Sequence, residues 1–174
     1  VQRGLEFLHA STGAGETVPD SALSLNQAAL VTLLWCAAGQ PDVRAKRTIA
    51  QKQWYATAAL WAEESGLWGE AAFDPDVAVT REQLALVLYR YAEFSGAASS
   101  KRADLTSYPD AESVDESARE AMQWAVASGL LAGSGTGGIV YLAPKDAITG
   151  EDAALVFARY LQSTVLIQKN NRQI

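Results

Sequence analysis

The chain has 174 residues, of which 49% are hydrophobic and 20% charged, a composition typical of a folded globular protein rather than a disordered chain. Its net charge of −6 repels nucleic acid and anionic lipid, and the densest basic run, residues 44–47, is expected to be a solvated connector. No stretch approaches the about 20 consecutive apolar residues of a membrane-spanning helix. The single cysteine, Cys36, excludes an internal disulfide and a site built from several thiolates.

Residues 1–8 have the pattern of the interior of an amphipathic helix. They lack the basic start, apolar run and small-residue cleavage site of a signal peptide, and the only methionine is Met122. We therefore expect the chain to be a piece of a longer protein, with any targeting signal outside it.

Three segments of the chain align without gaps, at residues 19–31, 75–87 and 144–156. Each has a proline five residues before a serine or threonine, and an Ala-Leu-Val triplet five residues after it. The hydroxyl residues Ser24, Thr80 and Thr149 are predicted helix N-caps. Gln27 and Gln83, three residues after the first two, would complete capping boxes.

Apolar residues at helical spacing follow each predicted start, which indicates a buried helical face. The faces are Leu84, Val87, Leu88 and Tyr91 in the second segment, Ala153, Val156, Phe157 and Tyr160 in the third, and a weaker version at Ala28, Val31, Thr32 and Trp35 in the first. Gly39 and Gly96 are expected to end their helices, whereas the third helix continues towards Ile167.

A second helix is predicted before each aligned segment, at residues 54–65 and 117–128, and in the first unit only at residues 4–10. The two complete helices contain Trp61 and Trp124, which we expect mainly as core residues, and stop at Gly66 and Gly129. The chain is therefore predicted to be all-α, with helix–loop–helix repeats at 1–45, 46–100 and 101–174 that share one core.

These strings resemble the S-layer homology (SLH) family. The second unit contributes Gly66-Leu67, Phe73-Asp-Pro75 and Val79-Thr-Arg-Glu-Gln83, and the third Tyr108-Pro-Asp110, Gly129-Leu130, Leu142-Ala-Pro144 and Ile148-Thr-Gly-Glu-Asp152. The resemblance implies three units packed as a pseudo-threefold helical spindle on an extracellular, cell-wall protein. It also implies grooves that bind an anionic secondary cell-wall polymer, often through pyruvylated N-acetylmannosamine.

The resemblance also implies which residues bind that polymer. The family's Thr-Arg-Ala-Glu motif aligns with Thr80, Arg81 and Glu82, where the arginine would hold the anionic sugar and the acid would order the helix start. Glu151 is the matching acid of the third unit and a further candidate. Asp110, Trp61 and Trp124 are candidate walls of the groove. Leu25 and Gly150 replace the arginine in the other units, so at most one groove is fully equipped.

Two alternatives to glycan binding stay open. Arg81 could be a surface salt-bridge partner, and the repeats could form a spacer or a protein-interaction unit that self-associates in a surface array. An Arg81→Ala variant distinguishes them, because only anchoring predicts weaker binding to the wall.

The sequence does not predict an enzyme. No pattern places its single histidine, His9, or Cys36 beside an orienting acid, as nucleophilic catalysis requires. The glycine-rich run 133–138 lacks the Lys-Ser/Thr of a phosphate-binding loop and is expected to be a flexible loop. Asp74 and Asp76 lack the alternating ligands of a calcium loop. We expect neither a cofactor nor a metal.

Overall fold

The computed structural model of the protein describes residues 24–44, 53–69, 72–135 and 139–171. Within these ranges the chain is all-α, as predicted, and its β-type pairing consists of isolated bridges. The elements are α2 (Gln27–Ala37), α3 (Ala56–Glu64), α4 (Arg81–Phe94), the 3-10 helix η1 (Ala111–Ser113), α5 (Glu116–Ala127) and α6 (Gly150–Asn171). None of the described helices combines the length and apolarity needed to cross a membrane. The predicted helix at residues 4–10, His9 and Pro19 lie outside the described residues.

The chain divides into two compact units, which are described separately. The first unit contains α2 and α3 and runs up to Val79, with Thr149–Glu151 added to it. The second contains Thr80–Ile148, with α4 and α5, and the part of α6 that starts at Asp152. The predicted division into three repeats stays a prediction.

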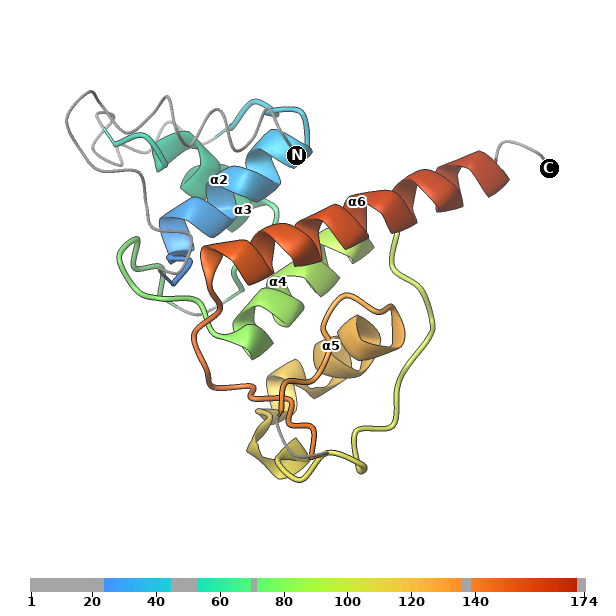
Figure 1. The fold of residues 1–174 in the computed structure, drawn as a ribbon. Helices are drawn as coiled ribbons and strands as arrows, with labels where there is room; N and C mark the ends of the chain where they lie inside the picture. The colour runs from blue at the N-terminus through green and yellow to red at the C-terminus, as the bar shows by residue number, and fades with distance from the viewer. Residues whose placement is uncertain (1–23, 45–52, 70–71, 136–138, 172–174) are drawn as a thin grey trace. The chain divides into compact units, whose positions relative to one another are not determined.

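The first unit is built on the contact between α2 and α3, which lie side by side (Figure 1). Leu30, Val31 and Leu34 of α2 are buried, as are Ala58 and Trp61 of α3. Each large apolar side chain removed from water in this way contributes about 1.5–3 kcal/mol. The burial of these residues therefore holds two short helices together that would be only marginally stable alone.

The apolar face predicted for the first segment is only partly correct. Ala28, Val31 and Thr32 are buried, and the Thr32 hydroxyl donates to the Ala28 carbonyl at 2.8 Å. Trp35, however, is half-buried and donates its indole N–H to the carbonyl of Pro41 at 2.9 Å. It lies at the border of the core because its polar edge is held by the loop that follows α2.

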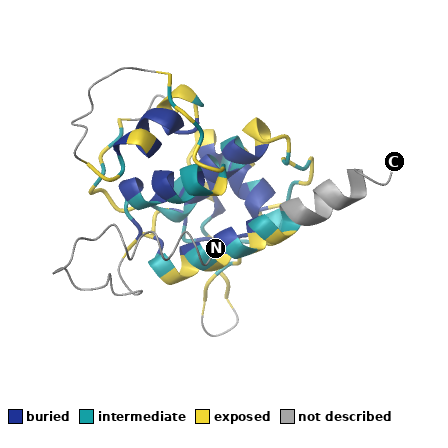
Figure 2. Ribbon diagram, turned by 90° about the horizontal axis from the view of Figure 1, so that it is seen from above, coloured by how far each residue is buried: buried dark blue, intermediate teal, exposed yellow. Residues whose placement is uncertain are grey.

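The second unit is built on α4, α5 and α6. Both predicted apolar faces are buried here, Leu84, Val87, Leu88 and Tyr91 on α4 and Ala153, Val156, Phe157 and Tyr160 on α6. The Tyr160 ring lies 5.8 Å from that of Tyr91 and 6.5 Å from that of Trp124 on α5, which ties the three helices together. Buried and exposed residues alternate along α6 as far as Ser163, as expected for an amphipathic helix (Figure 2).

Glycines end the first helix of each pair by the same local geometry. Gly66 after α3 and Gly129 after α5 have φ of +67° and +68°, a left-handed conformation that glycine adopts without steric cost. The next residue, Leu67 or Leu130, is buried and donates its backbone N–H back into the last helical turn. This is the hydrogen-bond pattern of a Schellman motif, and it confirms the predicted helix ends.

The predicted start of the second helix is correct in one segment and wrong in another. Thr80 caps α4, and a capping box with Gln83 is complete, as expected. Ser24, however, does not cap α2: the helix begins two residues later than predicted, and the N-cap is Asn26. Gln27 completes no capping box, because its side-chain oxygen instead accepts the backbone N–H of Asp74 at 2.9 Å.

A shared tertiary contact explains this two-residue shift. The first backbone N–H groups of an α-helix lack partners within the helix, and in both α2 and α4 two of them donate to carbonyls of a proline-containing loop. The pairs are Gln27 with Val77 and Ala28 with Pro75 in the first unit, and Arg81 with Asp146 and Glu82 with Pro144 in the second. By this pattern Asn26, not Ser24, is the counterpart of Thr80.

Candidate functional site

The candidate site lies in the second unit, where Arg81 is the first residue of α4. Its guanidinium donates from Nε to the Leu142 carbonyl at 2.9 Å and from one terminal nitrogen to the Ala132 carbonyl at 2.6 Å. No carboxylate among the described residues forms an ion pair with Arg81. A cation at the positive end of a helix dipole is unfavourable unless an anion comes close. The alternative of a surface salt bridge therefore finds no partner in the described part of the chain.

Asp110 fixes the loop that holds Arg81. Its two carboxylate oxygens accept the backbone N–H groups of Leu142 and Ala143, at 2.9 and 2.7 Å. Ala143 has a φ of +50°, a strained conformation for a residue with a Cβ, which persists only where the surroundings impose it. Asp110 thus positions the Leu142 carbonyl that accepts from Arg81, and both of its oxygens are engaged in that contact.

Glu82 is buried, with 5% of its surface exposed, and ties three segments together. One carboxylate oxygen accepts from Lys145 at 2.5 Å and the other accepts the backbone N–H of Asp115 at 3.1 Å. Lys145 also pairs with the Asp115 carboxylate at 2.6 Å. Its hydrogen bond lowers the pKa of the Asp115 carboxyl, while its bonds to Asp115 and Glu82 raise the pKa of Lys145. Glu82 therefore orders the starts of α4 and α5, in line with the structural role expected for it.

A shallow cleft lies next to this loop. Its volume is about 400 Å³, and it is lined by Ser107, Tyr108, Pro109, Ile139 and Val140. On one side of the cleft, Ser134 and Tyr141 exchange reciprocal backbone hydrogen bonds, at 2.9 and 2.8 Å.

Gly133, which follows the Ala132 that binds Arg81, packs tightly against the residues of this cleft. A Cβ at this position would lie 2.1 Å from a Val140 methyl carbon and 3.0 Å from the Tyr108 ring. Only glycine therefore fits, and the cleft and the guanidinium share one stretch of backbone. The residues 136–138 of the predicted glycine-rich loop lie outside the described residues.

The remaining predicted site residues do not join this group. Trp61 in the first unit and Trp124 in the second are buried, which confirms their expected place in the core and leaves them little surface to line a groove. The Trp124 ring lies 5.4 Å from that of Tyr89. Glu151 is exposed at the second residue of α6 and is assigned to the first unit. Its role as a ligand stays a prediction.

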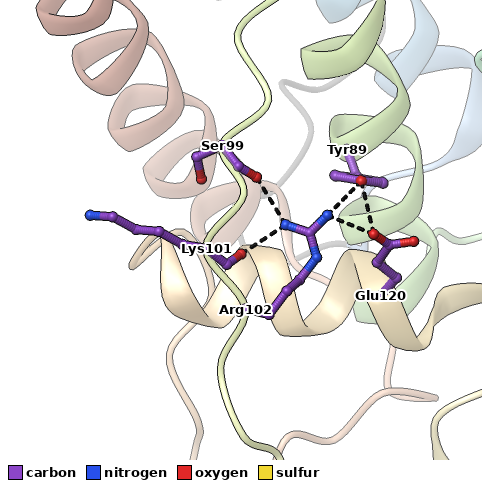
Figure 3. A network of polar contacts seen from close by, with 5 residues as sticks. All are labelled: Tyr89, Ser99, Lys101, Arg102 and Glu120. Carbon is purple, nitrogen blue, oxygen red and sulfur yellow. Dashed lines mark hydrogen bonds and ion pairs between the residues drawn. The ribbon is translucent and has the colours of Figure 1, made fainter.

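Arg102 provides a contrast to Arg81 within the same unit (Figure 3). One terminal nitrogen donates to the Tyr89 hydroxyl and to Glu120, both at 2.6 Å, and the other donates to the carbonyls of Ser99 and Lys101. This network fastens the loop after α4 to α4 and α5. The Glu120 carboxylate compensates the charge of Arg102, whereas no carboxylate among the described residues compensates the charge of Arg81.

The sequence predicts Thr80, Arg81, Glu82 and Asp110 as ligand residues, and the structure places these four residues together in the second unit; that they bind a ligand stays a prediction. The sequence does not predict Lys145, Asp115 and the carbonyl acceptors of Arg81, which no local pattern marks. Tyr108 is part of a predicted motif, but the sequence does not mark it as a residue that lines a cleft.

Comparison with known proteins identifies the domain. Residues 107–154 match the family model of the S-layer homology domain. The chain is also 33% identical over 113 residues to the surface-layer 125 kDa protein of Lysinibacillus sphaericus, a match that covers 63% of the chain and 9% of that protein. The chain thus spans less than a tenth of this relative's length. Residues 107–154 are therefore an S-layer homology domain, as the sequence motifs in this part of the chain predicted.

Proposed function

We propose that this chain, an S-layer homology module, attaches a bacterial surface protein to the cell wall by binding an anionic secondary wall polymer at Arg81. Cell-wall anchoring is the general role of the S-layer homology domain, which is an anchoring module rather than an enzyme. The observation that carries the proposal is the Arg81 guanidinium, which two backbone carbonyls hold at the start of α4 and which no acid of the described ranges neutralises. A pyruvyl carboxylate on a polymer sugar is the ligand that we propose for it.

Charge explains why a single fixed arginine matters. A protein of net charge −6 does not attract a carboxylated polymer by its overall field, so recognition needs a positioned cation. Arginine suits this role because its planar group binds a carboxylate with several parallel hydrogen bonds. One terminal nitrogen of Arg81 has no hydrogen bond to any described residue. We propose that this nitrogen binds the carboxylate of the ligand.

The affinity of one such site is modest. A hydrogen bond to a charged group contributes about 1.5–3 kcal/mol, far less than stable attachment requires. Useful retention on the wall therefore depends on several polymer repeats or several modules acting together, since linked sites bind far more tightly than single ones.

We also propose that the module consists of three repeats. The residue directly before the second helix of one repeat forms a β-bridge with a residue three positions before the first residue of the corresponding helix of another. These bridges are Asn26 with Ala78, Thr80 with Ala147, and Ser24 with Thr149. The same relation recurs three times along the chain, which supports three repeats, and Leu25 and Gly150 give the matching positions of the other two repeats no cation.

Binding to purified wall sacculi tests the proposed function. Sacculi that retain or lack the pyruvylated polymer would be incubated with the wild-type chain, Arg81→Ala and Arg159→Ala. Arg159 is a matched control because it belongs to the same unit and also donates to a backbone carbonyl, that of Leu130. We expect Arg81→Ala to weaken retention on polymer-bearing sacculi by at least tenfold, with unchanged helicity, and Arg159→Ala to bind as the wild type does.

Two results would contradict the proposal. One is equal retention of the wild-type chain on both kinds of sacculi, and the other is an equal effect of the two arginine variants.

A second candidate function is self-association, which one observation favours. Ile139, Val140 and Tyr141 are consecutive large apolar residues, and all three are exposed. Exposed apolar groups of this kind often mark protein contacts. Sedimentation of the wild-type chain and of an Ile139→Ser/Val140→Ser variant would test it, because self-association predicts a mass that falls to that of the monomer in the variant.

A further inference from the structure

A chain of aromatic rings in the first unit has no part in the proposed Arg81 site. The ring of Trp54 lies 5.5 Å from that of Tyr55, the Tyr55 ring lies 6.0 Å from Phe73, and Phe73 lies 5.5 Å from Trp68. We call these four residues the aromatic cluster. It runs from an exposed ring to a buried one, since Trp54 is 42% exposed and Trp68 only 8%.

The packing of the first unit does not require the exposed end of this cluster. The buried residues of α2 and α3 are aliphatic side chains together with Gln27, Thr32 and Trp61, and none of them belongs to the cluster. Trp54 lies two residues before the first residue of α3, outside both helices, and its position forfeits much of the burial that makes tryptophan stabilising. A large aromatic ring kept partly in water is more characteristic of a binding surface than of a core.

The buried end of the cluster contains one of three buried side-chain polar atoms that lack a hydrogen-bond partner among the described residues; the other two are on Ser99 and Trp124 of the second unit. The indole N–H of Trp68 is buried and has no hydrogen-bond partner in the described part of the chain. Buried donors in native proteins are nearly always paired, so an unpaired one needs an explanation. Its ring meets Phe73 edge-on, at an interplanar angle of 82°, so the unpaired donor belongs to the same cluster as the exposed Trp54.

The cluster is also held in place, as a binding surface must be. The residue after Phe73 donates its backbone N–H to the side chain of the buried Gln27, at 2.9 Å. Tyr55 is the residue that precedes α3 and is therefore fixed by the helix start. Tryptophan and tyrosine have few rotatable bonds, so a ligand that covers them immobilises little side-chain entropy.

We propose that the aromatic cluster is a second carbohydrate subsite, which stacks the uncharged face of a pyranose ring on Trp54, while Tyr55, whose ring stands at 89° to that of Trp54, borders the edge of the sugar. The C–H groups on one face of a pyranose pack against an aromatic ring, and the sugar hydroxyls around its edge find a donor in the indole N–H of the exposed Trp54 and a donor and acceptor in the phenol of Tyr55. None of the four side chains carries a charge at neutral pH, so the subsite selects for a sugar ring and not for its acidic substituent. It thereby complements Arg81, which selects for the acid.

This subsite rests on the cell-wall role of the chain but not on the Arg81 site, so the two can fail separately. The stacked ring could belong to the secondary polymer or to another polysaccharide of the wall. Comparing sacculi that retain and lack the secondary polymer separates these sources.

The experiment compares Trp54→Ala, Trp54→Tyr and Phe94→Ala with the wild-type chain. Phe94 is the matched control because it is an exposed aromatic residue of the second unit, on α4. Retention is measured on both kinds of sacculi. Binding of a soluble oligosaccharide of N-acetylglucosamine is followed separately by the NMR signal of the Trp54 indole N–H. That signal is assigned by its absence from the spectrum of Trp54→Tyr. Circular dichroism monitors folding.

We expect Trp54→Ala to weaken binding by about tenfold, which corresponds to about 1.4 kcal/mol, and Trp54→Tyr to restore most of it. Phe94→Ala should bind as the wild type does. If Trp54→Ala weakens binding to both kinds of sacculi, and the oligosaccharide shifts the indole signal, the subsite binds sugar rings of the wall in general. If Trp54→Ala weakens binding only to polymer-bearing sacculi, the stacked sugar ring belongs to the secondary polymer. The proposal is overturned if folded Trp54→Ala binds like the wild type on both, or if Phe94→Ala loses as much.

Discussion

Replacing Glu82 should destabilise the second unit, because this carboxylate is buried and bonded on both sides. In Glu82→Ala the Asp115 N–H loses a charged acceptor, a bond worth about 1.5–3 kcal/mol. The contact with Lys145 adds little, since that side chain is 48% exposed and keeps its second partner, Asp115. We therefore expect a loss of about 2–3 kcal/mol for Glu82→Ala and about 1 kcal/mol for Glu82→Gln, whose amide oxygen can still accept from Asp115.

Urea denaturation followed by circular dichroism at 222 nm measures these changes in the free energy of unfolding. Glu151→Ala is the matched control, because Glu151 is also the second residue of its helix but is exposed. Its effect should stay within about 0.5 kcal/mol. A Lys145→Met variant should destabilise the unit as well, since it leaves a buried carboxylate without its cation. The effects of Glu82→Ala and Lys145→Met should then be less than additive.

The reasoning about Glu82 is refuted if Glu82→Ala and Glu151→Ala shift the urea midpoint equally, or if the two variants of the Glu82–Lys145 pair add without coupling.

Two further predictions concern the second unit. A Cβ at position 135 would lie 1.9 Å from the backbone oxygen of Ile139, so Gly135→Ala should cost about 3 kcal/mol and speed amide exchange at Tyr141; unchanged exchange would contradict this packing. Burial raises the pKa of Tyr91 and of Tyr160 above the usual 10.0, so their contribution to stability is complete below pH 10 and is lost as the pH rises through the folded values. Urea midpoints between pH 9 and 12 should therefore fall less steeply for Tyr160→Phe than for the wild type, and equal slopes would refute the assignment.

The sequence by itself determined the local structure of this protein. The Thr80–Gln83 capping box and the glycine stops at 66 and 129 depend on hydrogen bonds between residues at most five positions apart. Such contacts are encoded in short spacings and can be predicted without a structure. The same holds for the apolar faces of α4 and α6, because 3.6-residue periodicity fixes which residues share a side.

Only the tertiary structure decided where α2 begins and what Arg81 contacts. Both Ser24 and Asn26 are good N-cap residues, and the choice between them depends on carbonyls of Pro75 and Val77, about 50 residues further along the chain. Arg81 likewise binds carbonyls 51 and 61 positions away. Backbone carbonyls are present at every residue, so nothing in their sequence marks them as partners, and only the folded chain brings one of them to a particular guanidinium.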